Sequence, residues 1–384
     1  MRVLVAPDCF GGTLTARQAA EAIAAGWRAT APQDTLMLRP LADGGPGFVE
    51  VLRVALGGTT HRRTVTGPLG EPVSAEWLEH EGTAYLECAQ ACGLHLVRDG
   101  TGRPPVAAAE RAGTRGVGEL IAAARDAGMH TAVIGLGGSA STDGGAGMLA
   151  ALDAAPVDAG GRELPPGGSA LARCAGLAGR ARLARPGSNR PMRLVAASDV
   201  ENPLLGEHGA ARVFGPQKGA DPDAVVRLEA GLTRFADVLA EATGRDVRHE
   251  TGAGAAGGLG AGLLALGASR VSGAGIVRRL TGLDAALDVA DLAVTGEGSF
   301  DWQSLRGKLI TAVARGAAER GVPCLVLSGQ VSVGRREAAA VGVEAAYSVA
   351  EHAGSVAAAF ADPAGTLAAL ARHVASQWSR PASA

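Results

Sequence analysis

Six acidic residues stand in loops beside glycine, proline or the ends of short apolar runs: Asp8, Asp43, Asp143, Asp199, Glu297 and Asp301. For any one carboxylate, capping a helix or stabilising a turn is the commoner role at such a position. Six together are harder to explain in this way, because magnesium–phosphate sites combine one or two carboxylates with a base or an orienting group. The set therefore raises the hypothesis of phosphoryl-transfer chemistry.

Lysine is almost absent from the chain. Among the 36 basic residues, only Lys218 and Lys308 are lysines, and both lie beside glycine. An ammonium group is a compact point charge that can approach a phosphate closely, whereas a guanidinium is a planar fork. The two lysines are either solvated surface groups or groups aimed at a phosphate or carboxylate. In the second case arginine would not replace them freely.

Two glycine-rich loops are candidates for binding an anion. The run from Gly135 to Ala140 follows a strand-like segment and leads through Asp143 into a helix, so its backbone N–H groups could face a phosphate. The run from Gly252 to Gly257 matches the dinucleotide fingerprint, but a polar segment precedes it instead of an apolar strand, which makes nicotinamide binding weakly supported. Tight backbone packing is the alternative for both loops. The chain has neither a Walker A motif nor the linked protein-kinase motifs.

Cysteine use points to a reducing compartment. The chain has five cysteines, an odd and small number that argues against a disulfide framework and suits the cytoplasm. Cys88, Cys92 and His95 have a loose metal-ligand spacing, but a fourth ligand is not apparent, and buried cysteine is often a small hydrophobe. Zinc is therefore the weaker of the two interpretations.

The composition excludes several classes of protein. Hydrophobic residues make up 47% of the 384 residues and charged residues 19%, which excludes global disorder. The net charge of −2 and the aromatic content of 3% argue against nucleic-acid binding. The longest uncharged run is too short and too weakly apolar to span a membrane. We therefore expect a cytoplasmic enzyme. The sequence leaves the oligomeric state open, and a homodimer is one of the assemblies that it allows.

Short apolar runs alternate with helical segments at both ends of the chain, which predicts an α/β fold with a parallel, helix-covered sheet. The expected strands there are Val3–Ala6, Leu36–Leu38, Leu292–Val294, Cys324–Leu327 and Ala345–Val349, and the expected helices are Thr15–Ala29, Leu309–Ala317 and Leu367–Trp378. The middle is richer in glycine, with strands expected at Ala84–Glu87, Ala132–Gly135 and Leu194–Ala197 and a loop from Pro156 to Pro191.

This pattern predicts two α/β domains. Residues 1–70 and 288–384 form one discontinuous domain, and residues 71–287 form an inserted second domain. We expect the strand that begins at Arg2 and the strand Leu292–Val294 to share one parallel sheet.

Several of these segments resemble the motifs of class II bacterial glycerate kinases, in the same order along nearly the whole chain. They are Ala6–Leu14, Ala42–Gly45, Gly137–Ala140 with Asp143–Leu149, Asp199–Leu204, Val213–Ala220, Gly252–Gly258, and Thr295–Gly298 with Asp301, Gln303, Gly307 and Lys308. The segment through Lys218 is the most specific of these.

The resemblance implies a Rossmann-like domain built from both termini and a phosphotransferase that uses ATP and Mg²⁺ to convert D-glycerate to 2-phosphoglycerate. The small hydroxy acid and the nucleotide are then the partners. The implied catalytic residues are Asp199, Lys218 and Lys308, with Asp199 also the metal ligand. The implied substrate-binding residues are Asp8, Asp43, Ser139, Asp143, Asn202, Glu297 and Asp301. The implied nucleotide-binding residues are Gly137, Gly138, Gly254, Gly257 and Gly258.

The chain departs from the family pattern in loops that carry charge elsewhere in the family. The family has Lys, Glu and Arg where this chain has Gly11, Pro46 and Ser299, and it has Asn at the position of Thr142. A contact to a charged group is worth roughly 1.5–3 kcal/mol, so three losses together could change the substrate. Two alternatives therefore remain: a paralogue of the same fold that acts on another small hydroxy acid, and a non-catalytic ligand-binding module.

Overall fold

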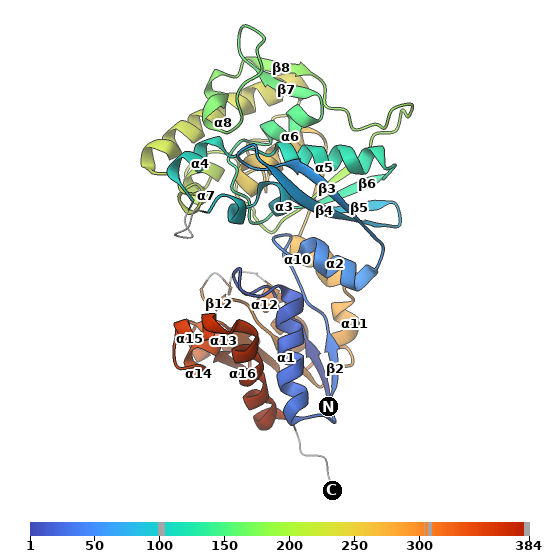
Figure 1. Cartoon of the computed structure of the whole chain (residues 1–384), viewed down its shortest axis with the longest axis vertical. Coiled ribbons are helices and arrows are strands. Elements are labelled where there is room, and N and C mark those ends of the chain that lie inside the picture. Colours follow the sequence, from blue (N-terminus) through green and yellow to red (C-terminus); the bar gives the residue numbers. More distant parts are fainter. Residues whose placement is uncertain (99–103, 303, 306–308, 380–384) are drawn as a thin grey trace. The chain divides into compact units, whose positions relative to one another are not determined.

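The computed structural model describes residues 1–98, 104–302, 304–305 and 309–379, which divide into two compact units (Figure 1). Unit 1 comprises Met1–Asp43, Glu50–Leu56 and Ala274–Ala384, and unit 2 comprises Gly44–Val49 and Gly57–Gly273. Helix α2 (Phe48–Leu56) therefore begins in unit 2 and continues in unit 1. None of the helices in the described ranges has the length and apolar character needed to cross a membrane.

The described part of unit 1 contains a five-stranded sheet in the order β15-β13-β11-β1-β2, with every pairing parallel. Its strands are β1 (Arg2–Val5), β2 (Thr35–Leu38), β11 (Leu292–Thr295), β13 (Cys324–Ser328) and β15 (Ala345–Ser348). Val3 lies opposite Leu292, so the prediction that these two strands share one parallel sheet is confirmed. Counted along the chain within this sheet, the strand order is 2-1-3-4-5, the flavodoxin-like variant of the doubly wound fold.

Helices accompany the unit 1 sheet. They are α1 (Ala16–Thr30), α10 (Gly273–Leu280), α11 (Leu283–Leu287), α12 (Leu309–Ala318), α13 (Arg335–Ala340), α14 (Val349–His352), α15 (Val356–Ala361) and α16 (Pro363–Trp378). A capping box starts α1, because Thr15 and Gln18 each accept a hydrogen bond from the backbone N–H of the other. Helices α1 and α16 pack side by side (Figure 1). A Cβ on Gly26 would lie 1.9 Å from Ala368 O, so only glycine allows this contact.

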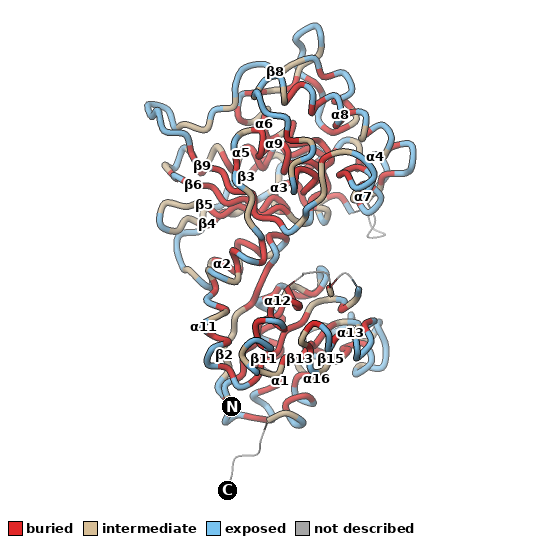
Figure 2. The backbone as a smooth tube through the Cα atoms, turned by 180° about the vertical axis from the view of Figure 1, so that it is seen from behind, coloured by how far each residue is buried: buried red, intermediate tan, exposed pale blue. Residues whose placement is uncertain are grey.

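The described part of unit 2 contains a six-stranded mixed sheet in the order β10-β9-β6-β5-β4-β3. Its strands are β3 (Thr59–Thr66), β4 (Pro72–His80), β5 (Thr83–Glu87), β6 (Thr131–Gly135), β9 (Arg193–Ala197) and β10 (Ser269–Val271). Strands β5, β6, β9 and β10 are parallel, and β4 runs antiparallel to both of its neighbours. The parallel strands β5, β6 and β9 are largely buried (Figure 2).

Helices and a small hairpin complete unit 2. The helices are α3 (Cys88–Cys92), α4 (Val106–Arg111), α5 (Arg115–Asp126), α6 (Ala146–Ala151), α7 (Ala210–Phe214), α8 (Pro222–Thr243) and α9 (Leu259–Ala265). The hairpin joins β7 (Ala154–Val157) to β8 (Gly176–Gly179). Asp221 caps α8 by accepting a hydrogen bond from Ala224 N, Pro222 occupies its first turn, and Gly244 ends it in the left-handed conformation.

Both expected domain limits differ from the division that the structure shows. Residues 59–66 belong to unit 2, because β3 pairs with β4 along its whole length. Residues 274–287 belong to unit 1, where they form most of α10 and α11. The prediction of a continuous loop from Pro156 to Pro191 is wrong, since the β7–β8 hairpin and a 3-10 helix at Ser169–Arg173 interrupt it.

Candidate active site

Two carboxylates, Asp8 and Glu297, follow neighbouring parallel strands of the unit 1 sheet. Asp8 lies in the loop after β1, and Glu297 lies in the loop after β11. The chain passes from β1 to β2 on one side, whereas β11 and the strands after it lie on the other side. The connections that follow β1 and β11 therefore lead in opposite directions across the sheet. In doubly wound sheets, ligands bind in the crevice outside the carboxyl ends of the strands at such a switch point.

Hydrogen bonds between the ends of β1 and β11 fix the spacing of these loops. Thr295 Oγ1 donates to Ala6 O over 2.7 Å, and Asp8 N donates to Gly296 O over 2.8 Å. Each bond joins the β1 side to the β11 side. The carboxyl-bearing loops are therefore held beside each other by the backbone and by a buried threonine.

Negative charge is concentrated at the Asp8 carboxyl group. Burial, and after it the neighbouring carboxyl groups of Asp43 and Glu297, raise the pKa of Asp8 to about 8, although the hydrogen bond from Cys9 N opposes the rise. That bond spans 2.7 Å. Because the neighbouring charges are of the same sign, this position favours a bound cation over a bound anion.

A cavity of about 460 Å³ adjoins these carboxylates within unit 1, a volume typical of small-molecule sites. The acidic end of the cavity includes Asp8, Glu297 and Asp301. Its apolar wall includes Phe10, Val356, Phe360 and Leu367. Among the described residues, none that lines this cavity carries a positive charge. Gly11 and Ser299, where the family resemblance leads us to expect basic side chains, also line it.

The residues at the acidic end fit a magnesium ion. In the described ranges, no three His, Cys, Asp or Glu side chains are grouped closely enough to hold a metal by themselves. Mg²⁺ does not need such a cage, because it commonly uses one or two carboxylates and takes its other ligands from water and substrate phosphates. Asp8 and Glu297 provide this partial set of donors, and a cation would relieve the crowding that raises the pKa of Asp8.

In unit 2, Asp143 is bonded entirely within the protein. Its buried carboxylate accepts hydrogen bonds from Thr114 N and Oγ1, both at 2.9 Å, and from Gly145 N and Gly147 N, both at 3.1 Å. Burial raises the pKa of Asp143, and these hydrogen bonds oppose the rise. The carboxylate therefore occupies the amides at the start of α6 that could otherwise bind a phosphate.

Lys218 is also buried, at 3% exposure, so it is not a solvated surface group. Its ammonium group donates to Ser139 Oγ over 3.1 Å and to Ser141 O over 2.6 Å. Burial lowers the pKa of Lys218 to about 8, and the nearby Cys92, Cys88 and Asp143 act in the opposite direction. The lysine thus ties the 3-10 turn Pro216–Lys218 to the loop that follows β6.

The glycines of unit 2 differ in exposure. Gly254, Gly257 and Gly258 are buried, and a Cβ on Gly257, whose φ is +68°, would lie 1.9 Å from Ser141 O. Gly138 is exposed and Gly137 is half-buried. The close contacts of Gly254, Gly257 and Gly258 fit the interpretation that glycine there allows tight backbone packing. The nucleotide-binding role of all five glycines stays a prediction.

Asp199 and Asn202 follow β9, the strand that pairs with β6. Asp199 is exposed and accepts a hydrogen bond from Ser272 Oγ at 2.5 Å. Asn202 Nδ2 donates to His208 O over 2.8 Å. The structure thus brings the loop containing Ser139 and the loop containing Asp199 to the same edge of the unit 2 sheet. Lys308 lies outside the described residues.

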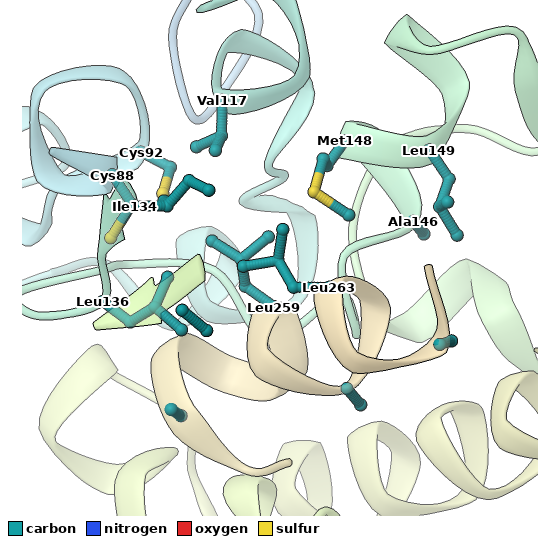
Figure 3. Close-up of a cluster of buried hydrophobic side chains, with 14 of the residues drawn as sticks. Cys88, Cys92, Val117, Ile134, Leu136, Ala146, Met148, Leu149, Leu259 and Leu263 are labelled. Atoms are coloured by element: carbon teal, nitrogen blue, oxygen red, sulfur yellow. The ribbon is translucent and has the colours of Figure 1, made fainter. Parts of the chain in front are cut away.

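Cys88 and Cys92 belong to the core of unit 2, beside Ile134 and Leu136 (Figure 3). Both are fully buried, and the neighbouring Cys88 together with burial raises the pKa of the Cys92 thiol. Neither they nor His95 form part of a metal-binding group within the described ranges. The cysteines therefore serve as small hydrophobic side chains.

Sequence reasoning missed three polar residues that hold the candidate loops. The buried Ser304 hydroxyl donates to Glu297 Oε1, Thr114 bonds Asp143, and Glu87 accepts from Gly47 N at 3.1 Å and Val49 N at 3.3 Å. Of the three, only Ser304 could have been selected from the sequence, because it lies three residues after Asp301 in a segment that resembles the family motif. The partners of Thr114 and Glu87 are distant in sequence.

Comparisons with known proteins agree with this arrangement. The glycerate kinase family model matches residues 3–379. An uncharacterized protein of Mycobacterium tuberculosis (strain CDC 1551 / Oshkosh) is 49% identical over 98% of this chain and 91% of its own length. A glycerate kinase of Bacillus subtilis (strain 168) is 40% identical over 98% of this chain and 97% of its own. A crystal structure assigned to glycerate kinase 2 of Salmonella typhimurium LT2 has a TM-score of 0.77 at 36% identity and covers 98% of both chains.

The two α/β units and the carboxylates at the strand ends define an α/β phosphotransferase of the small-molecule kinase type. The chain belongs to the glycerate kinase family.

Replacing Lys218 by arginine tests whether its ammonium group positions a loop. The larger guanidinium overfills a buried space, so we expect Lys218→Arg to lower the free energy of unfolding by about 1–3 kcal/mol, as measured by chemical denaturation. Arg212→Lys, at an exposed position of α7, is the matched control and should change little. A Lys218→Arg protein of wild-type stability that loses only kcat/KM would show instead that the ammonium faces a ligand.

Glu87 makes stability depend on pH. Burial raises the pKa of Glu87 to about 7 from 4.5, although Gly47 and Val49 donate hydrogen bonds to it. The folded state then binds more protons between these values, so this contribution is complete below pH 4.5 and is lost as the pH rises through 7. Between pH 5 and 8, wild-type protein should lose roughly 2–3 kcal/mol more unfolding free energy than Glu87→Gln.

Chemical denaturation at both pH values measures this difference, with Glu50→Gln on α2 as the control. Equal losses in the wild type and Glu87→Gln would contradict the assignment.

Proposed function

We propose that this protein transfers a phosphoryl group from ATP to D-glycerate and yields 2-phosphoglycerate. The observation that carries the proposal is the pair Asp8 and Glu297 at the carboxyl ends of adjacent parallel strands, beside a cavity in a chain of the glycerate kinase family. We also propose that the enzyme works in the cytoplasm, since all five cysteines are unpaired.

Asp8 and Glu297 would hold the magnesium ion. When bound, Mg²⁺ neutralises charge on the phosphate oxygens and helps to position them for transfer. Asp43 adds to the negative potential at this position, because its charge acts on Asp8 directly. Ser304 keeps Glu297 in place by donating a hydrogen bond to its carboxylate. Charge at the acidic end is thus arranged to receive a metal–phosphate group.

Asp199 is our candidate for orienting or deprotonating the hydroxyl that attacks the phosphorus. It is exposed at the end of a parallel strand, where a substrate hydroxyl can reach it, and Ser272 fixes its carboxylate from one side. We assign Lys218 and Asp143 to holding the neighbouring loop, because both are buried and bonded within the protein. Lys308 remains our candidate for binding the carboxylate or a phosphate.

A related activity on another hydroxy acid is the second candidate. Gly11 and Ser299 both line the cavity of unit 1, and both stand where the family resemblance leads us to expect a basic side chain. The loss of positive charge at a ligand-lining position can change which acid is accepted.

Turnover of ATP with D-glycerate and Mg²⁺ tests the proposal, and phosphorus NMR of the product shows which hydroxyl is phosphorylated. We expect a phosphorus signal coupled to the proton on C2. Asp199→Asn should lower kcat at least 100-fold, because positioned acid–base groups contribute 10²–10⁴ in rate. Asp223→Asn, in the first turn of α8, is the matched control.

A panel of other small hydroxy acids is measured in parallel. Faster turnover of one of them would select the second candidate, and no phosphorylation of any acid would overturn both.

A further inference from the structure

Helix α15 presents an uncovered apolar face to the cavity of unit 1. None of its six residues is buried. Val356 is 43% exposed and Phe360 is 60% exposed, although both line the cavity. Residues four apart lie on the same face of a helix, so the two side chains form one apolar surface. Leaving them in water forgoes the free energy that burial of their apolar area would give.

The exposure of Phe360 is unusual for this chain. Aromatic residues are scarce, and Phe10, Phe48, Phe235 and Phe300 are all buried. Among the described residues, the large hydrophobic side chains exposed to 60% or more are Val226, Trp302 and Phe360. Phe360 lines the cavity, and Trp302 directly follows Asp301, which also lines it. Of these three side chains, only Phe360 lines the cavity.

The charge of the cavity restricts its occupant. Its acidic end contains Asp8 and Glu297, and none of its described lining residues is basic. These described carboxylates favour a phosphate that arrives with a bound metal ion over free phosphate. A ligand with a neutral planar ring at one end and a metal-bound phosphate chain at the other matches both the apolar wall and the acidic end.

We propose that the wall formed by Val356, Ala359 and Phe360 is the nucleobase subsite for the ATP of the reaction. The purine packs against Phe360, and the phosphate chain extends toward Asp8 and Glu297. The side-chain amide of Gln330, exposed on the same lining, can pair with the polar edge of the base. This inference rests on the proposed kinase function and places the base in unit 1, apart from the glycine loops of unit 2.

Two tryptophan substitutions on α15 test the assignment. Ala359 lines the cavity, whereas Ala357 is exposed on the same helix and does not line it. Isothermal titration of ATP with Mg²⁺ should show a Kd at least tenfold higher for Ala359→Trp, because the indole fills the space of the base. Ala357→Trp should stay within twofold of the wild type. Phe360→Ala should raise the Kd at least fivefold, because the base loses the aromatic ring against which it stacks.

A further titration separates the possible occupants. Inorganic tripolyphosphate with Mg²⁺ lacks a base, so its Kd should be the same in wild-type protein and all three variants. Equal ATP affinity in Ala359→Trp and Ala357→Trp would overturn the inference. So would a parallel loss of tripolyphosphate affinity, or a rise only in the KM for glycerate. Thermal unfolding of each variant confirms that the fold is retained.

The outcome is independent of turnover. If D-glycerate is not phosphorylated but Ala359→Trp still weakens ATP binding, the proposed function fails and the base subsite stands. If turnover is normal and the ATP affinities of the variants are unchanged, the subsite fails and the proposed function stands.

Discussion

The crowding of like charges at the end of the unit 1 sheet is the constraint on which the site depends. A parallel pairing of β1 with β11 places the loops after both strands at one edge, and each loop carries a carboxylate. The backbone bond from Asp8 to Gly296 keeps the loops together despite the repulsion. Burial, together with the neighbouring carboxyl groups of Asp43 and Glu297, raises the pKa of Asp8 to about 8. Such crowding favours a bound cation over a bound anion at this position, which is the basis of our proposal for magnesium.

The charged residues of unit 2 serve a different purpose. Asp143, Lys218 and Glu87 are each buried and each bond to backbone groups or hydroxyls of the loops around them. An uncompensated buried charge is costly, so these bonds make the loop conformations strongly preferred. The two units therefore divide the work. In unit 1, carboxylates line a cavity. In unit 2, buried charges fix the loop that follows β6 and the backbone at the start of α2.

The sequence was sufficient to predict the five strands of the unit 1 sheet and the helices α1, α12 and α16, because short apolar runs that alternate with helical segments have a clear periodicity. It also selected Asp8 and Glu297, since proline or glycine beside an acidic residue at a strand end is visible locally. It did not predict the β3–β4 hairpin, because β3 is mostly exposed and polar and contains no run of apolar residues. The burial of Lys218 and Asp143 was equally hidden, because it depends on Ser139, Ser141 and Thr114, which meet them only in the folded chain. The apolar wall of α15 was not predicted, because its short, alanine-rich sequence is typical of an ordinary surface helix.

The most direct test of this account is a crystal structure with Mg²⁺ and a non-hydrolysable ATP analogue. We expect density for the metal within coordination distance of Asp8 or Glu297 and for the base against Phe360. Density for the base over Gly137 and Gly138 of unit 2, with the cavity of unit 1 lacking the nucleotide, would contradict it.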